Sequence, residues 1–268
     1  MQLDLNGRVV IVTGAGRGIG RVIAETFVAE RAVVVGVDLS ADALGWLDEA
    51  RTAAGLEGAS LPADVTDGPG TRALVEEVVA RFGRVDVLVN NAGVILEGLV
   101  EDLDDDAWDR CFAVNVGGVF KMCRAVVPTM KAQHYGRIVN AASFAAIVPS
   151  IGAGAYAATK SAVVQLSRTL AGELGPWGVT VNSYAPGMIP TAMNGFADMP
   201  TATQDRLLNT LTLRRWGEAQ EVADAVVFLA SDAARYVTGT LLDVSGGKLA
   251  TQLPQKAYEL PQAEGLQP

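Results

Sequence analysis

Short apolar runs alternate along the chain with stretches of helical spacing. The apolar runs, in which Val and Ile are not interleaved with polar residues, are 8–13, 32–37, 85–89, 137–139 and 179–181. Apolar side chains recur at helical spacing over 21–30, 71–82, 107–130, 155–173 and 218–231. Unbroken apolar runs are typical of strands buried on both faces. Their alternation with helices predicts an α/β fold: a single doubly wound, Rossmann-type domain with a mainly parallel sheet and helices on both faces.

No linker-like segment divides the chain, so we expect one dinucleotide-binding catalytic domain over residues 1–247. Residues 192–213 interrupt the alternation and contain Met193, Phe196 and Met199, flexible apolar side chains that suit a variable pocket. We expect this segment to be a substrate lid that is mobile without substrate and orders on closure. Residues 248–268 have three prolines and little periodicity, and are expected to form a C-terminal tail.

Composition excludes several function classes. Half of the 268 residues are hydrophobic, which excludes a disordered chain. The net charge of −9 is opposite to that of a nucleic-acid-binding surface. One histidine (His134) and two cysteines (Cys111 and Cys123) leave no set of ligands for a metal site and no Ser-His triad, so we expect no metal. No leader-like segment and no uninterrupted apolar run near ~18 residues is present, so we expect a cytoplasmic protein without a membrane segment.

A glycine cluster lies between the first predicted strand and the first predicted helix, and it contains Gly14, Gly18 and Gly20 together with Arg17 and Ile19. Glycine allows a sharp turn and a close approach of the backbone to a pyrophosphate, and the following helix N-terminus provides N–H donors. A plain turn would use glycine as well. The position between strand and helix favours a dinucleotide phosphate site.

Asp38 ends the second apolar run, 18 residues after Gly20. A carboxylate there can accept hydrogen bonds from an adenosine ribose and would repel a 2′-phosphate. Asp38 would also serve as a helix cap. Arg17 could attract a 2′-phosphate, but Leu39 adds no second cation, so NAD is favoured over NADP.

Further along the chain, Asn90-Asn91-Ala92-Gly93 ends a strand, and Tyr156 and Lys160 follow Ser143 by 13 and 17 residues. In this order, and with the glycine turn, these motifs resemble the short-chain dehydrogenase/reductase family. The resemblance covers about residues 5–247.

Tyr156 and Lys160 are one helical turn apart. They could be two solvated side chains on one helix face. A free Tyr hydroxyl has a pKa near ~10, and a neighbouring ammonium would lower it. We therefore expect a lowered pKa for Tyr156, which would act as general acid in ketone reduction and as general base in alcohol oxidation.

The resemblance implies further roles. Lys160 would also hold the nicotinamide ribose, Ser143 would hydrogen-bond the substrate oxygen, and Asn115 would steady a proton-relay water. Considered singly, Ser143 is a small residue at a strand end and Asn115 an amide that kinks its helix. The resemblance also implies cofactor contacts at Asp64, Val65, Asn91, Ala92, Gly93, Pro186, Gly187, Ile189 and Thr191. Asp64 would also serve as a capping residue.

The sequence departs from the family pattern at two places. Ser245 stands before Gly246-Gly247, where members often have Asp, and this leaves assembly details open. His134 and Trp177 stand where acyl-carrier-protein reductases of the family have arginines near the substrate mouth, which argues against a carrier-protein substrate. The loops at 94–96 and 144–149 are apolar and fit a small, mostly uncharged ketone or secondary alcohol.

The sequence thus predicts an NAD(H)-dependent oxidoreductase that transfers a hydride between nicotinamide and such a substrate. One alternative is an NADPH-dependent 3-oxoacyl-thioester reductase, and another is a non-catalytic dinucleotide sensor. By analogy with the family we expect a homotetramer, with Met122, Val126, Val163 and Leu166 on the exposed faces of two long helices. The alternative is that these four side chains all face the sheet.

Overall fold

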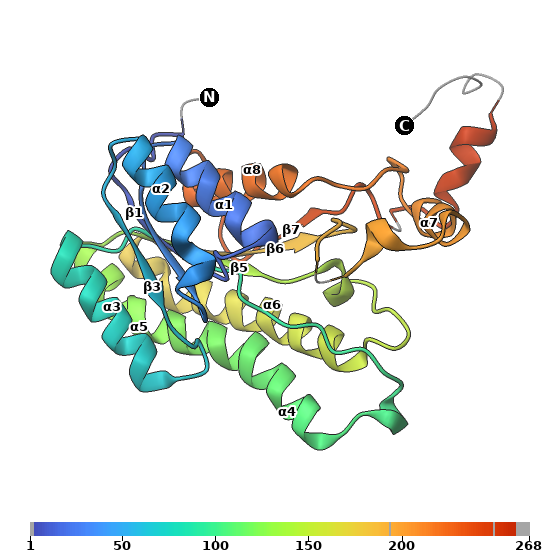
Figure 1. The fold of residues 1–268 in the computed structure, drawn as a ribbon, viewed down its shortest axis with the longest axis horizontal. Coiled ribbons are helices and arrows are strands. Elements are labelled where there is room, and N and C mark those ends of the chain that lie inside the picture. The colour runs from blue at the N-terminus through green and yellow to red at the C-terminus, as the bar shows by residue number, and fades with distance from the viewer. Residues whose placement is uncertain (1–2, 193, 249, 261–268) are drawn as a thin grey trace.

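The computed structural model describes residues 3–192, 194–248 and 250–260. Its centre is a parallel sheet of seven strands in the order β3-β2-β1-β4-β5-β6-β7 (Figure 1). The strands are β1 Val9–Thr13, β2 Val33–Asp38, β3 Gly58–Pro62, β4 Val87–Asn90, β5 Gly136–Ala141, β6 Val179–Pro186 and β7 Leu241–Val244. The chain returns to the middle of the sheet between β3 and β4, which is the doubly wound order expected from the sequence.

The five apolar runs correspond to β1, β2, β4, β5 and β6, and the strands buried along their whole length include β1, β4 and β5. The two edge strands were not predicted. β3 has the sequence Gly-Ala-Ser-Leu-Pro and β7 has Leu-Leu-Asp-Val, and both are largely half-buried or exposed. An edge strand has a neighbour on one side only, so it needs no continuous apolar run.

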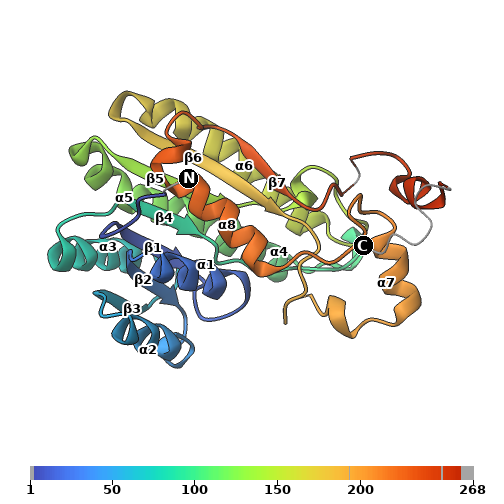
Figure 2. The same cartoon turned by 90° about the horizontal axis from the view of Figure 1, so that it is seen from above.

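Helices cover both faces of the sheet (Figures 1 and 2). One face packs against α1 Gly18–Ala29, α2 Gly45–Ala53 and α8 Ala219–Ala230, and the other against α3 Gly68–Phe82, α5 Val119–Gln133 and α6 Gly154–Leu174. Two shorter helices, α4 Asp105–Phe112 and α7 Thr201–Leu208, lie toward the carboxyl ends of the strands. The two hydrophobic cores therefore lie one on each side of the sheet.

Four apolar residues on the long helices α5 and α6 were expected to be exposed, and the structure places them against the sheet. Met122, Val126 and Val163 are completely buried in the core beneath the sheet, and Leu166 is partly buried against the same core. The expectation that these residues are exposed is wrong, because their apolar surface is already covered by the strands. The predicted homotetramer therefore has to rest on other surfaces.

α4, a π-helical turn at Ala113–Gly118 and α5 form one continuous helical stretch, Asp105–Gln133. By length and composition alone this stretch could cross a membrane. In the fold, Met122, Val126 and Met130 on α5 are fully buried against the sheet. Packing against the sheet thus accounts for part of the apolar character of the stretch.

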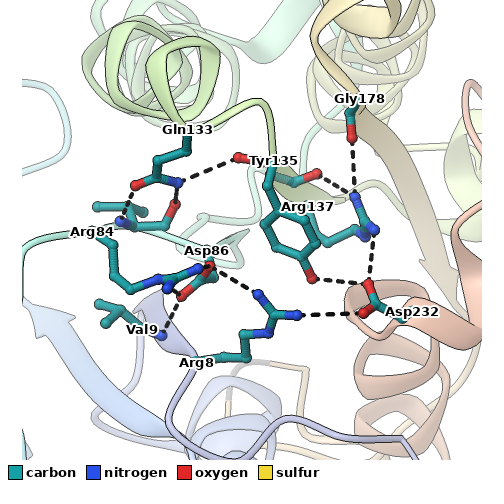
Figure 3. Close-up of polar contacts among 11 residues, drawn as sticks. Arg8, Val9, Arg84, Asp86, Gln133, Tyr135, Arg137, Gly178 and Asp232 are labelled. Atoms are coloured by element: carbon teal, nitrogen blue, oxygen red, sulfur yellow. Dashed lines mark hydrogen bonds and ion pairs between the residues drawn. The ribbon is translucent and has the colours of Figure 1, made fainter.

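A network of charged groups joins the starts of the central strands (Figure 3). The buried carboxylate of Asp86, just before β4, accepts hydrogen bonds from the Val9 amide at 2.9 Å and from Arg84 at 2.6 and 2.8 Å. Arg8 bridges Asp86 and Asp232 at 3.4 and 3.3 Å. This network locks β1 to β4 at the edge where the strands begin.

Arg137 extends the network to β5. Its guanidinium pairs with Asp232 at 2.9 Å, and the ring of Tyr135 lies between Arg137 and Arg8, 4.3 Å from each (Figure 3). Such stacking of guanidinium groups on an aromatic ring adds cation–π attraction. The cluster lies at the opposite end of the strands from the residues that the sequence assigns to chemistry.

Candidate active site

The predicted site residues converge at the edge of the sheet where the strands end. The glycine turn follows β1, Asp38 ends β2, Asn91 follows β4, and Ser143 follows β5. In open α/β sheets ligands bind at this edge, beside the point where the strand order reverses. β1 and β4 flank that point, so the turn and Asn91 lie next to each other.

The glycine turn requires glycine at several positions, either for its backbone angles or for lack of space. Gly14 and Gly18 have φ angles of +67° and +57°, and a Cβ on Gly20 would lie 2.1 Å from the Gly14 carbonyl oxygen. α1 begins at Gly18, and Ile19 is partly buried within its first turn. A tight turn that opens a helix is the cradle that a pyrophosphate requires, so these residues fit the phosphates of a dinucleotide.

Asn91 and Thr13 hold this turn against the end of β4. The Asn91 amide Nδ2 donates to the carbonyl oxygens of Thr13 at 3.1 Å and Gly14 at 3.3 Å. The Thr13 hydroxyl accepts from the amides of Asn91 and Ala92, and the Tyr184 hydroxyl donates to Asn91 Oδ1 at 3.1 Å. Thr13 and Tyr184 were not predicted, because each lies inside an apolar strand and acts only through a partner distant in sequence.

Asp38 contacts the glycine turn directly. Its Oδ2 accepts from the Gly16 amide at 2.9 Å, and its Oδ1 accepts from the Leu39 amide at 2.8 Å. The helical turn that follows starts at Asp42 with Ala41 at its N-cap, so Asp38 does not cap it. Arg17 and Leu39 are both exposed beside the carboxylate.

Asp64 and Val65, expected at the adenine, follow β3 at this edge of the sheet. The segment 186–191, expected at the nicotinamide, lies at the end of β6 at the same edge. Asp64 accepts from the Thr66 amide at 2.8 Å, and the N-cap of α3 is Asp67, so Asp64 shapes a turn and caps no helix. A Cβ on Gly118 would meet Val65 at 2.7 Å, which places Val65 against the π-helical turn.

The loop after β6 is held on two sides. The Gly187 amide, which follows Pro186, donates to the Val244 carbonyl at 3.0 Å. Asn194 donates to the Ile189 carbonyl and accepts from the Thr191 amide, at 2.8 and 3.1 Å. Asn194 is a positioning residue that the sequence did not single out.

Ser143 and Tyr156 are the two residues that the sequence predicts to act on the substrate oxygen. Ser143 is 5% exposed, and its Oγ accepts from the Ala145 amide at 3.1 Å. Burial raises the pKa of the Tyr156 phenol, while a side-chain hydrogen bond with Ser143 acts in the opposite direction. The phenol therefore remains protonated at neutral pH.

The expected lowering of the Tyr156 pKa by Lys160 is wrong for this structure. The Lys160 ammonium lies 5.6 Å from the centre of the phenol ring and donates to the Ala141 carbonyl at 2.8 Å. Burial of this ammonium lowers its own pKa to about 8. Desolvation thus dominates both groups, and it favours the neutral form of each.

Asn115 lies in the π-helical turn and is fully buried. Its amide makes a two-sided bridge to Val94: Oδ1 accepts from the Val94 amide at 2.8 Å, and Nδ2 donates to the Val94 carbonyl at 2.9 Å. Nδ2 also donates to the Thr159 hydroxyl at 3.1 Å. The side chain thereby fixes the loop after β4 to α6, the helix that bears Tyr156 and Lys160.

The segment expected to be a lid contains α7 and is partly tied to the turn after β7. The Leu213 amide donates to the Gly246 carbonyl at 3.0 Å, and the Thr212 hydroxyl donates to the Gly247 carbonyl at 2.9 Å. Phe196 stacks on Trp216 with ring centres 5.5 Å apart. Met193, which was expected to line the pocket, lies outside the described residues. The mobility of this segment stays a prediction.

The expectation that His134 and Trp177 flank the mouth of the site is wrong for this chain. His134 follows α5 and precedes β5, and Trp177 precedes β6, so both lie where these strands begin. Ser143 and Pro186 lie where the same strands end. The identity of the residues at 134 and 177 therefore says nothing about the pocket of the same chain.

A family model described as "Enoyl-(Acyl carrier protein) reductase" matches residues 14–248. The 3-oxoacyl-[acyl-carrier-protein] reductase FabG of Thermotoga maritima is 39% identical over 247 residues, covering 91% of this chain and 99% of the relative. The Escherichia coli protein of the same name is 38% identical over 249 residues, covering 91% and 98%.

Solved structures match over similar lengths. Levodione reductase aligns with a TM-score of 0.87 and 35% identity over 92% of this chain and 99% of its own. NAD⁺-bound xylitol dehydrogenase aligns with a TM-score of 0.87 and 31% identity over 91% and 100%. With the glycine turn, Ser143, Tyr156 and Lys160 at one edge of a matching fold, the chain belongs to the short-chain dehydrogenase/reductase family.

Proposed function

We propose that this oxidoreductase uses NAD(H) to interconvert a small ketone and the matching secondary alcohol. The observation that carries the proposal is the placement of Ser143, Tyr156 and Lys160. The Ser143 hydroxyl opposes the rise in the pKa of the half-buried Tyr156 phenol, and Lys160 is held one helical turn away by the Ala141 carbonyl. A dinucleotide sensor without turnover has no need for such a set of proton-moving groups.

The residues at the strand ends fit a dinucleotide. Gly14, Arg17, Gly18, Ile19 and Gly20 would hold the phosphates, and Asp38 and Leu39 the adenosine ribose. Asp64, Val65, Asn91, Ala92 and Gly93 would contact the adenosine side, and Pro186, Gly187, Ile189 and Thr191 the nicotinamide side. A bound nicotinamide supplies or accepts the hydride at the carbonyl carbon. The Asp38 carboxylate disfavours a 2′-phosphate, which supports NAD.

Tyr156 moves the proton at the substrate oxygen. In reduction its phenol donates to the oxygen as negative charge develops there, while the Ser143 hydroxyl orients and stabilises the same oxygen. The phenol of Tyr156 is protonated at neutral pH, which is the form that donates in reduction. Lys160 would hold the nicotinamide ribose, and Asn115 would steady the water that returns the proton to the site.

Two apolar loops form walls for the substrate. Val94, Ile95 and Leu96 follow Gly93, and Ile147 and Val148 follow Ser143. The loops are joined where the Gly98 amide donates to the Gly152 carbonyl at 2.8 Å. Apolar walls beside a polar centre suit a ketone with a hydrocarbon body.

The names of the curated relatives favour a second candidate, reduction of a 3-oxoacyl thioester with NADPH. The two candidates share the chemistry and differ in the cofactor and in the group that the substrate carries beside its ketone. We place the protein in the cytoplasm, as a homotetramer without nucleic-acid or membrane partners. Residues 1–247 would be the catalytic domain and 248–268 its tail.

Initial rates decide between the candidates. A panel of ketones, secondary alcohols and a 3-oxoacyl thioester is assayed with NADH or NAD⁺ and with NADPH or NADP⁺. We expect the highest kcat/KM for a small ketone with NADH. A clear preference for the thioester with NADPH supports the second candidate and contradicts the first. Cofactor binding without turnover of any substrate supports a sensor.

A further inference from the structure

A second lysine, Lys248, contacts the loop that follows Ser143. It follows Gly246-Gly247 at the end of β7, and its backbone amide donates to Ser245 Oγ at 3.1 Å. Its ammonium is 5.1 Å from the centre of the Phe144 ring. Phe144 follows Ser143 in the loop after β5, so this cation contacts the loop that bears the group proposed to bind the substrate oxygen.

The Lys248 ammonium is held by Thr210, which lies in the segment 192–213 that was expected to be a lid. Its Nζ donates to the Thr210 hydroxyl at 2.7 Å, and that hydroxyl donates in turn to the Leu207 carbonyl at 2.6 Å. The Thr210 oxygen is therefore oriented as an acceptor for the ammonium. An ammonium has three N–H donors, and this contact uses one of them.

Within the described residues, Lys248 makes no ion pair with a carboxylate. Neighbouring cations have partners: Arg215 pairs with Glu221, and Arg214 donates to Asn209 and stacks on Tyr258. The turn before Lys248 has a neutral hydroxyl at Ser245, so it supplies no charge either. Lys248 is half-buried, and burial lowers its pKa, so a nearby anion would recover part of the lost hydration.

We propose that Lys248 determines specificity by binding a carboxylate of the substrate, so that the enzyme acts on a small oxo acid or the matching hydroxy acid. This inference rests on the proposed function and narrows its substrate class from ketones in general. The carboxylate would lie between Phe144 and Thr210, and the apolar loops at Val94–Leu96 and Ile147–Val148 would take the hydrocarbon part. The hydride and proton transfers remain those at Tyr156 and the carbonyl group.

Binding tests the inference without turnover. Pyruvate, acetoacetate and levulinate have their carboxylate at increasing distance from the ketone, and each has a neutral methyl ester. Each compound is titrated calorimetrically into protein saturated with NAD⁺, because an oxidised cofactor cannot pass a hydride to a ketone. We expect at least one acid to bind about tenfold or more tightly than its ester, as a charge-assisted hydrogen bond would give.

Variants assign the preference to the side chain. K248M should remove the difference between acid and ester, and K248R should retain part of it, because the guanidinium keeps the charge. K256M, a neutralised lysine on the exposed face of the same tail, should leave the difference unchanged. Steady-state kinetics with NADH should show the same pattern as a loss of the acid-to-ester ratio of kcat/KM in K248M.

Equal binding of all three acids and their esters to the unmodified protein would overturn the inference, as would a preference that survives in K248M. These results are distinct from a failure of the proposed function. Turnover of ketones combined with equal binding of the acids and their esters would refute the inference alone. Lys248-dependent binding of an acid without any turnover would refute the oxidoreductase proposal and leave the anion site standing.

Discussion

The ammonium of Lys160 donates to the main-chain carbonyl of Ala141 across 2.8 Å, at the point where β5 ends. This contact, together with burial, fixes Lys160 beneath the loop that bears Ser143. Lys160 is only 4% exposed and is bonded to a carbonyl, and it has no carboxylate partner among the residues that the structure describes, so it is costly to keep charged.

That cost predicts a pH dependence of stability. The pKa of Lys160 is about 8 in the folded protein and 10.5 in the unfolded chain. Between these values the unfolded chain binds more protons, so the free energy of unfolding rises with pH through this window. From pH 7.5 to 9.5, we expect the wild-type value to rise relative to K160M by about 1–2 kcal/mol in chemical denaturation.

K131M is the matched control for this experiment. Lys131 lies over the ring of Trp177, 3.9 Å from its centre, and is only partly buried. Its removal should leave the pH slope of the wild type intact. If K160M and the wild type showed parallel pH profiles, the ammonium would not be desolvated as the structure indicates.

The charge of Asp38 should determine whether the enzyme prefers NADH or NADPH. D38N keeps an oxygen acceptor for the Gly16 amide but removes the charge that would repel a 2′-phosphate. We expect the NADPH-to-NADH ratio of kcat/KM to increase about tenfold or more. D42N, at an exposed carboxylate in the next helical turn, should leave the ratio unchanged. A wild-type preference for NADPH, or no response to D38N, would remove Asp38 from this role.

Replacing Asp86 should lower the stability of the fold without lowering the catalytic rate. D86N removes the buried charge that pairs with Arg84 and with Arg8, although Arg8 keeps Asp232 as a second partner. Because both guanidinium groups are partly exposed, we expect a cost of about 1.5–3 kcal/mol. The network lies at the start of the strands, so kcat per folded molecule should stay within about twofold. D48N breaks an exposed pair with Arg51 and should cost less than about 1 kcal/mol. Denaturation curves and active-site-normalised rates measure both effects, and equal costs for the two variants would contradict the structure.

The sequence was sufficient for the sheet interior and the order of the site motifs. Unbroken apolar runs predict β1, β2, β4, β5 and β6, and the spacing from Ser143 to Tyr156 and Lys160 places all three at one edge. The edge strands β3 and β7 were missed, because a strand with one neighbour does not need an apolar run. The prediction that Met122, Val126 and Val163 are exposed failed for a different reason. Helical spacing shows which residues form an apolar face, but it does not show which element covers that face.

The electrostatics of the site could not be predicted from spacing. One helical turn brings Tyr156 and Lys160 near each other, and that alone suggested a lowered phenol pKa. The structure adds the burial of both groups and the Ala141 carbonyl, and burial reverses the direction. Lys248 was missed for a similar reason, because only the fold brings residue 248 to Phe144.

The most direct test of the proposed chemistry is a Tyr156→Phe variant. It is compared with the wild type in two measurements, the dissociation constant for NADH and the rate of ketone reduction at saturating NADH. We expect NADH binding within about threefold of the wild type and a rate at least about 10²-fold lower, because the proton donor at the carbonyl oxygen is lost. A Tyr156→Phe protein that binds NADH normally and reduces the ketone at the wild-type rate would contradict the assignment of Tyr156 as the acid.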